Sequence, residues 1–278
     1  MPAIKPLLSS LVIFSLFFSA CTQSKGKSFV PSIPGYDDKK HEVLVLKKYL
    51  LEISGLVYLG ESRFAAINDE EGELFFVNLL NDSAVKHRFK GKGDYEELVK
   101  VDSTFYVLES TGDITEVAPP FNTHKTYKFG GKKIEFESMV YYPSTRKLVI
   151  IAKDQKKRVD GIHAYAFDIA SKTFSPSPMF SISFKEVFTV LTNYNTECKP
   201  SAAAINPVNK KLYIIASIGK VILECEQDGT LLNIYKINPT HFPQPEGITF
   251  ANNGDMYISN EGAAGKATIL KFPYSGQK

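Results

Sequence analysis

The sequence lacks several features that would point directly to a known chemistry. Its 278 residues include only three cysteines and five histidines, and the histidines show no regular spacing. The chain therefore offers no His pair or Cys cluster for a soft transition-metal site. It has no Gly-x-Ser-x-Gly elbow, no His-Glu-x-x-His motif and no P-loop. The net charge is only +3, so no strongly basic field indicates nucleic acid as a partner.

The N-terminal residues have the pattern of an export signal. Lys5 precedes an apolar run over residues 7–18, which is too short to span a bilayer comfortably and has the size of a signal-peptide core. The segment Phe18-Ser19-Ala20-Cys21 resembles a bacterial lipobox, in which cleavage occurs before a cysteine that is then lipidated. Phe18 departs from the usual leucine of that motif. The alternative is an ordinary signal peptide with an incidental cysteine.

This pattern predicts three parts of the chain. Residues 1–20 form a lipoprotein signal peptide, residues 21–40 comprise the lipidated Cys21 and a flexible tether, and residues 41–278 form the folded domain. A lipidated Cys21 would anchor the protein to a membrane of the bacterial cell envelope, on its periplasmic or surface side, without a transmembrane helix. We expect the other two cysteines, Cys198 and Cys225, to be free thiols, because they fall at opposite ends of one repeat.

A short motif occurs five times along the chain. It consists of a polar residue, a spacer, Ser or Glu, a small or polar residue, and an apolar run. The third residues of the five copies are Ser54, Glu96, Glu137, Ser201 and Glu246. Successive copies are 41 to 45 residues apart, except for a step of 64 residues before Ser201. Two apolar strands joined by a turn follow each copy, as is typical of the four-stranded blades of a β-propeller.

The sequence therefore predicts an all-β protein, a five-bladed β-propeller. The last repeat is too short for a fourth strand, whereas residues 42–47 have a strand pattern and no repeat of their own. We predict that this N-terminal strand completes the fifth blade and closes the ring. The long step contains an insertion at residues 175–197, within which a helix and a strand are both compatible with residues 184–195. A sixth blade is the alternative.

Acidic residues recur at the start of each innermost strand and at the end of the next strand. Because these two strands run antiparallel, both sets belong to one rim of the central channel. Crowded carboxylates must take up protons or bind a cation, and oxygen-rich sites suit Ca²⁺. The candidate calcium ligands are Glu52, Asp69, Glu96, Glu109, Glu137, Asp154, Glu246 and Glu261. In the alternative interpretation, each residue only caps neighbouring backbone amides and joins adjacent blades.

The same residues carry a resemblance to a known family. Residues 52–56 with 68–74, residues 95–96 with 107–110, and residues 245–248 with 257–261 look like the SdiA-regulated (YjiK-like) propeller family. The resemblance spans residues 42–273. It implies a five-bladed propeller distantly related to NHL-repeat proteins, exported, with a bound calcium ion and no settled reaction. The sequence departs from this pattern in the fourth repeat, where Lys199-Pro200-Ser201 brings no carboxylate.

Two further features allow different interpretations. His241 lies in a Pro-flanked loop before Glu246, where it could act as a general base, but we interpret it as an exposed loop histidine. The cationic run 153–158 is typical of a solvated turn, and binding of an anion or a lipid headgroup is the alternative.

The sequence therefore favours an envelope protein whose channel binds a divalent cation, acting as a binding or scaffold module or as a calcium-responsive one. The partner at the channel mouth, a protein or a small molecule, is not identified. The alternative function is a metal-dependent hydrolase acting on esters, lactones or phosphoesters.

Overall fold

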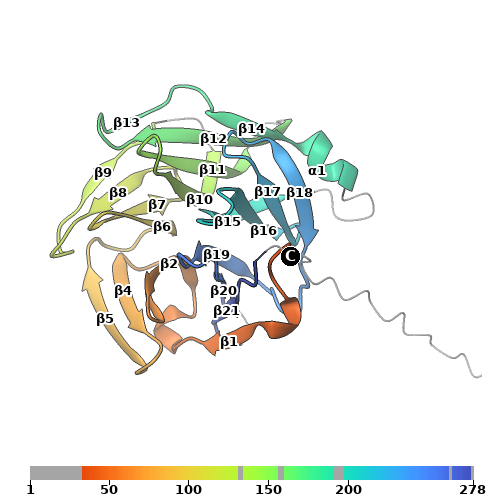
Figure 1. Ribbon diagram of the computed structural model, residues 1–278. Coiled ribbons are helices and arrows are strands. Elements are labelled where there is room, and N and C mark those ends of the chain that lie inside the picture. The colour runs from red at the N-terminus through yellow and green to blue at the C-terminus, as the bar shows by residue number, and fades with distance from the viewer. Residues whose placement is uncertain (1–32, 131–133, 156–159, 191–196, 263–264, 277–278) are drawn as a thin grey trace, which may run out of the picture.

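The computed structural model describes residues 33–130, 134–155, 160–190, 197–262 and 265–276. The predicted signal peptide, Cys21 and most of the tether lie outside the described residues. The described strands form five antiparallel sheets arranged around a central axis, like the blades of a propeller (Figure 1). The predicted all-β, five-bladed fold is confirmed.

The first two blades are regular four-stranded meanders. Blade one consists of β2 (Ile53–Gly60), β3 (Arg63–Asn68), β4 (Glu73–Asn78) and β5 (Ser83–Arg88). Blade two consists of β6 (Tyr95–Val101), β7 (Thr104–Glu109), β8 (Ile114–Val117) and β9 (Lys125–Tyr127). The inner strands are rich in Val, Ile, Leu, Phe and Tyr, which suit a pleated surface packed on both faces.

Blade three contains the insertion. It consists of β10 (Ile134–Tyr142), β11 (Lys147–Gln155), β12 (Gly161–Asp168), β13 (Thr173–Phe174) and β14 (Phe180–Ser183), followed by the helix α1 (Phe184–Val190). Both β13 and β14 pair with β12, so the outer strand of this blade is made in two parts. The insertion therefore supplies a strand and a short helix. It does not form a sixth blade.

Blade four is regular, and blade five closes the ring. Blade four consists of β15 (Lys199–Ile205), β16 (Leu212–Ile218), β17 (Val221–Cys225) and β18 (Leu231–Lys236). Blade five consists of β19 (Pro245–Phe250), β20 (Met256–Asn260), β21 (Thr268–Phe272) and the N-terminal β1 (Glu42–Val45). Strand β1 pairs antiparallel with β21, so both ends of the domain are held in one sheet, as the sequence predicts.

Two short 3₁₀ helices flank the closing strand. They are η1 (Asp38–Lys40), before β1, and η2 (Lys48–Leu50), between β1 and β2. Leu50 of η2 is buried in the core between blades five and one.

The core lies between the blades. Five clusters of buried apolar side chains each join two neighbouring sheets, and together they complete the circle. Cys198 and Cys225 are buried in the cluster between blades three and four, and both are free thiols, as expected. Among the described residues, no helix is both long and apolar enough to cross a bilayer.

Candidate functional site

The motif that repeats in the sequence forms a β-bulge in every blade. In β2 the register skips Ser54, so that Ile53 faces Asn68 and Gly55 faces Ile67. Equivalent skips occur at Glu96, Glu137, Ser201 and Glu246. A bulge leaves one residue outside the ladder and turns its side chain to a new direction. The third residue of each repeat is therefore placed at the start of the channel by the same backbone device.

A cavity of about 330 Å³ opens at this end of the channel, and we call it the acidic mouth. Eight of its lining residues are carboxylates, one is a lysine and three are neutral. The lining comprises Glu52, Ile53, Ser54, Asp69, Asp94, Glu96, Glu135, Glu137, Lys153, Gln244, Glu246 and Glu261. All of these acids except Asp94 and Glu135 are candidate calcium ligands predicted from the sequence. Asp94 and Glu135 lie two residues before Glu96 and Glu137, and that spacing is the signal that points to them.

The acidic mouth does not include every candidate ligand. Two candidate ligands, Glu109 and Asp154, lie outside its lining. Lys90 Nζ lies 2.6 Å from Glu109 Oε1, and Lys199 Nζ lies 3.0 Å from Asp154 Oδ2. These two ion pairs hold their carboxylates between blades.

Lys153 is the one basic residue in the lining of the acidic mouth, so the two sides of the mouth differ in charge. It is not part of a solvated turn: it lies in β11, at a register skip opposite Glu135 and Phe136, and its Nζ contacts Glu137 Oε1. Burial raises the pKa of Glu96 to about 8, with Asp94 adding to the shift and Lys153 opposing it. The half that contains Glu96 and Glu137 thus already has a cation of its own.

The other half has no basic side chain in the cavity lining. Burial, followed by the charges of Glu52 and Glu70, raises the pKa of Asp69. Burial and the neighbouring Glu52 also raise the pKa of Glu261. Ser54 Oγ and Asp69 Oδ1 are buried and have no hydrogen-bond partner. Unpartnered buried oxygens are rare in folded proteins, because each has lost its water without a replacement.

Near Glu246, hydrogen bonds from two serines of blade four join this blade to blade five. Burial raises the pKa of Glu246 to about 7, while a hydrogen bond from Ser217 Oγ, 3.2 Å from Oε1, opposes the shift. In the fourth repeat, Ser201 Oγ donates to the Pro245 carbonyl at 2.6 Å. Ser201 therefore joins blade four to blade five, as the alternative interpretation expected, but through a backbone carbonyl and not through an amide.

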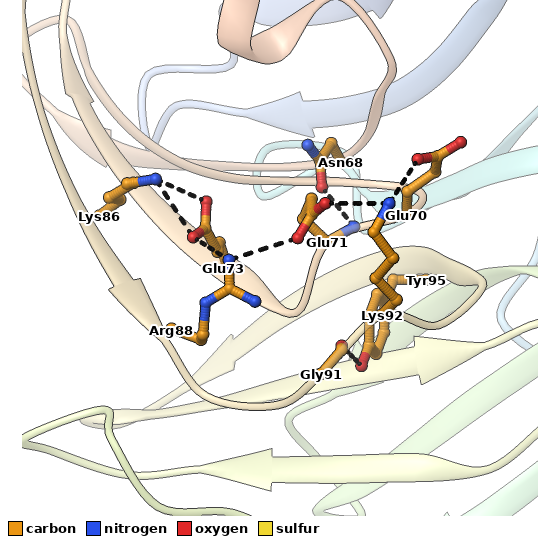
Figure 2. A network of polar contacts seen from close by, with 9 residues as sticks. All are labelled: Asn68, Glu70, Glu71, Glu73, Lys86, Arg88, Gly91, Lys92 and Tyr95. Atoms are coloured by element: carbon orange, nitrogen blue, oxygen red, sulfur yellow. Dashed lines mark hydrogen bonds and ion pairs between the residues drawn. The ribbon is translucent and has the colours of Figure 1, made fainter.

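Three acids that follow Asp69 in the chain, Glu70, Glu71 and Glu73, are paired with nearby cations. Figure 2 shows Glu73 between Lys86 and Arg88, with its Oε1 2.8 Å from the Arg88 guanidinium. Lys92 lies 3.5 Å from Glu70 and 3.4 Å from Glu71. Asp69 precedes these residues in the chain but points into the mouth. The shortage of cations is therefore particular to the mouth and is not a property of this stretch of sequence.

At the fourth residue of the motif, neighbouring blades pack closely together below the acidic mouth. A Cβ atom on Gly55 would lie 2.6 Å from Leu98 N, so the strands of blades one and two meet too closely for any side chain there. Blades three, four and five have Ser138, Ala202 and Gly247 at this position. Blade two has Glu97, which is 2% exposed. The sequence analysis did not identify Glu97, because it considered the third residue of the motif, Glu96, and Glu97 is the fourth.

His241 does not line the acidic mouth. Its side chain is exposed, and its ring centroid lies 5.3 Å from that of His41. It is a loop histidine, consistent with the interpretation favoured from the sequence.

The acidic mouth fits a hard cation by chemistry more than by preformed geometry. Among the described residues, no three His, Cys, Asp or Glu side chains are gathered as a metal-binding group. The donors available in the half without a lysine are all oxygens, and two of them are unpartnered. Such a set suits Ca²⁺, which tolerates irregular geometry.

Comparisons with known proteins identify the class of fold. No family model matches the sequence, and no curated protein matches it. A calcium-binding protein, regucalcin, from Agrobacterium tumefaciens is 12% identical, with 84% of this chain and 94% of that chain covered and a TM-score of 0.54. A luciferin-regenerating enzyme is 11% identical, with coverage of 86% and 97% and a TM-score of 0.52.

A third structure is a Bacteroides thetaiotaomicron protein of unknown function. It is 9% identical with a TM-score of 0.55, and the match covers 81% of this chain but only 56% of that one. At these identities the likeness concerns the fold alone. The chain thus has a β-propeller fold, and the comparisons do not single out the SdiA-regulated family.

Proposed function

We propose that the protein is a binding module whose acidic mouth holds a divalent cation, Ca²⁺ first among them. The observation that carries this proposal is the half of the mouth without a lysine, where Ser54 Oγ and Asp69 Oδ1 are buried without partners. Glu52, Ser54, Asp69, Glu246 and Glu261 would hold the ion. It would supply the positive charge that these crowded oxygens lack.

The experiment is a thermal-shift titration of the mature domain with Ca²⁺ and Mg²⁺. An ion that binds only the folded state raises the Tm as its concentration exceeds the Kd. We expect a rise of several degrees at millimolar Ca²⁺ in the wild type and a much smaller one in Asp69→Asn. Glu109→Gln is the matched control, because Glu109 lies outside the mouth and pairs with Lys90. An unchanged wild-type Tm at 10 mM Ca²⁺, about ten times the Kd of the weakest extracellular sites, contradicts the proposal.

Anchoring through Cys21 is part of the same proposal and is supported by the lipobox-like segment at residues 18–21. The described chain joins the propeller at the end opposite to the acidic mouth. There the Tyr36 hydroxyl donates to the Gly254 carbonyl at 2.6 Å and accepts from Asn206 Nδ2 at 2.9 Å. The acidic mouth would then face away from the membrane. Cys21→Ser should move the protein from the membrane to the soluble fraction, and mass spectrometry of the N-terminus should lose the acyl groups.

Metal-dependent hydrolysis is the second candidate. It is favoured by Glu96 and Glu246, whose pKa values of about 8 and about 7 suit general acid–base catalysis near neutral pH. The test is a panel of ester, lactone and phosphoester substrates, with Glu246→Gln as the inactive control. Membership in the SdiA-regulated family, with its bound calcium, is proposed on the motif resemblance described above.

A further inference from the structure

A second cavity, of about 590 Å³, lies at the other end of the channel, and we call it the apolar mouth. Each blade contributes an apolar residue from its innermost strand: Val57, Leu98, Val140, Ala203 and Ile248. The volume falls within the range of pockets that enclose small organic ligands. None of the candidate calcium ligands lines it.

Three charged side chains line the apolar mouth, and they are unevenly placed: Glu97, Lys100 and Lys210. Glu97 is 2% exposed and lies three residues before Lys100 in β6, so about 10 Å of extended strand separates the two. Lys100 is the second-last residue of β6, and Lys210 lies in the turn between β15 and β16. Both lysines are exposed. The cavity therefore has an inner end where a carboxyl group is buried and an outer end with two exposed ammonium groups.

Neither lysine of the apolar mouth has an acidic partner among the described residues. Lys100 Nζ donates to the Asp102 carbonyl, and Lys210 Nζ donates to the Pro207 carbonyl at 2.6 Å. The Asp102 carboxylate lies 3.3 Å from the Arg146 guanidinium instead. One exposed lysine is ordinary, but two at the rim of one apolar cavity favour an anionic group there, because complementary charge is what selects a partner at such a rim.

We propose that the apolar mouth binds an amphiphilic anion, a single hydrocarbon chain with a carboxylate head, as in a fatty acid. The apolar residues of the five blades enclose the chain, and its burial supplies most of the affinity. The carboxylate stays at the outer end, where Lys100 and Lys210 donate charged hydrogen bonds to it. The reverse orientation would bring the head toward the carboxyl group of Glu97 and away from both cations. The proposal is independent of the cation proposed for the acidic mouth.

The chain has no tryptophan, so a single introduced indole reports on the site. Phe250 lines the apolar mouth, and Phe250→Trp places the indole there. The probes are decanoate, decanol and decyltrimethylammonium, which have similar chains and differ in the charge of the head. Each is used below the concentration at which it forms micelles. In fluorescence titrations, decanoate should bind about tenfold more tightly than decanol, as two exposed ion pairs predict, and the cation should bind more weakly than either.

Changes at the lysines then test where the head lies. In the reporter background, Lys100→Met combined with Lys210→Met should bind decanoate no more tightly than decanol, and each single change should weaken decanoate binding about threefold. Lys147→Met is the matched control, because Lys147 begins β11 at the same end of the ring but lies outside the lining. Ala204→Phe fills the cavity and should weaken the binding of all three probes, whereas Asp69→Asn, at the acidic mouth, should change none.

Three results would overturn the proposal. Decanoate might fail to titrate the reporter, decanoate and decanol could bind it equally, or the preference for decanoate could survive when both lysines are changed. Titrations that Ala204→Phe leaves unchanged would also overturn it, because the probes would then bind elsewhere. Calorimetric titration of the wild-type protein with decanoate and decanol checks that the indole does not create the site, and its result decides if Phe250→Trp does not fold.

Discussion

The two mouths of one channel are built from the same five strands and have opposite chemistry. The strands begin at the acidic mouth, where carboxylates outnumber cations, and end at the apolar mouth, where Lys100 and Lys210 lie beyond an apolar lining. Between them, small residues bring the strands together, and only blade two inserts a large side chain, Glu97. The two cavities thus share no lining residue.

The largest expected effect comes from disturbing the close packing of the strands at Gly55. In Gly55→Ala the new Cβ would lie 2.6 Å from Leu98 N and 3.0 Å from Glu97 C, and backbone cannot yield as a side chain can. We expect the free energy of unfolding to fall by about 3 kcal/mol, the upper end for overpacking. Gly91→Ala is the control, because nothing lies within 4 Å of its Cβ position, and it should change stability by less than about 0.5 kcal/mol. Urea denaturation measures the free energy of unfolding of both variants. An equal decrease in the two variants would show that the close contact at Gly55 does not determine stability.

The ring and its closing strand could be predicted from the sequence, but the bulges at the acidic mouth could not. The repeat period, the strand pattern and the unpaired β1 predicted the ring and its closing strand, because these depend on local periodicity and on length. Residues two apart were expected on one face, which located the acids at one rim. The bulges at Ser54, Glu96 and Glu246 break that alternation. They could not be predicted from one strand alone, because a register shift is defined by the pairing of two strands.

Pairing across blades was equally hidden. The sequence pattern does not distinguish Glu109, which pairs with Lys90, from Asp69, which makes no ion pair among the described residues. Lys153 was interpreted as part of a solvated turn for the same reason, since it acts on carboxylates from another strand. Which acids remain unpaired is a property of the assembled ring.

The pH dependence of stability should sharpen the contrast between the mouths. The pKa of Glu96 is raised from 4.5 to about 8, so between these values the folded state binds more protons than the unfolded state. The free energy of unfolding therefore falls as the pH rises through this window, by on the order of 2 kcal/mol after allowance for solvent near the mouth. Glu96→Gln should flatten this part of the curve, and Glu61→Gln, on the exposed surface, should not. Denaturation at pH 5, 6, 7 and 8 measures how the free energy of unfolding changes with pH. If Glu96→Gln has the same pH dependence as the wild type, burial does not raise the pKa of Glu96.

The smallest expected effect concerns the cation that the acidic mouth already contains. Lys153 contacts Glu137 and lowers the pKa values of Glu96 and Glu246, so its charge reaches across the mouth. Removing it in Lys153→Gln takes away a repulsion felt by a second cation, and Ca²⁺ should bind about fivefold more tightly, roughly 1 kcal/mol. Lys199→Gln is the matched control, because Lys199 pairs with Asp154 outside the lining. Calorimetric titration compares the two, and weaker binding in Lys153→Gln would mean that the lysine organises the site instead of competing with the ion.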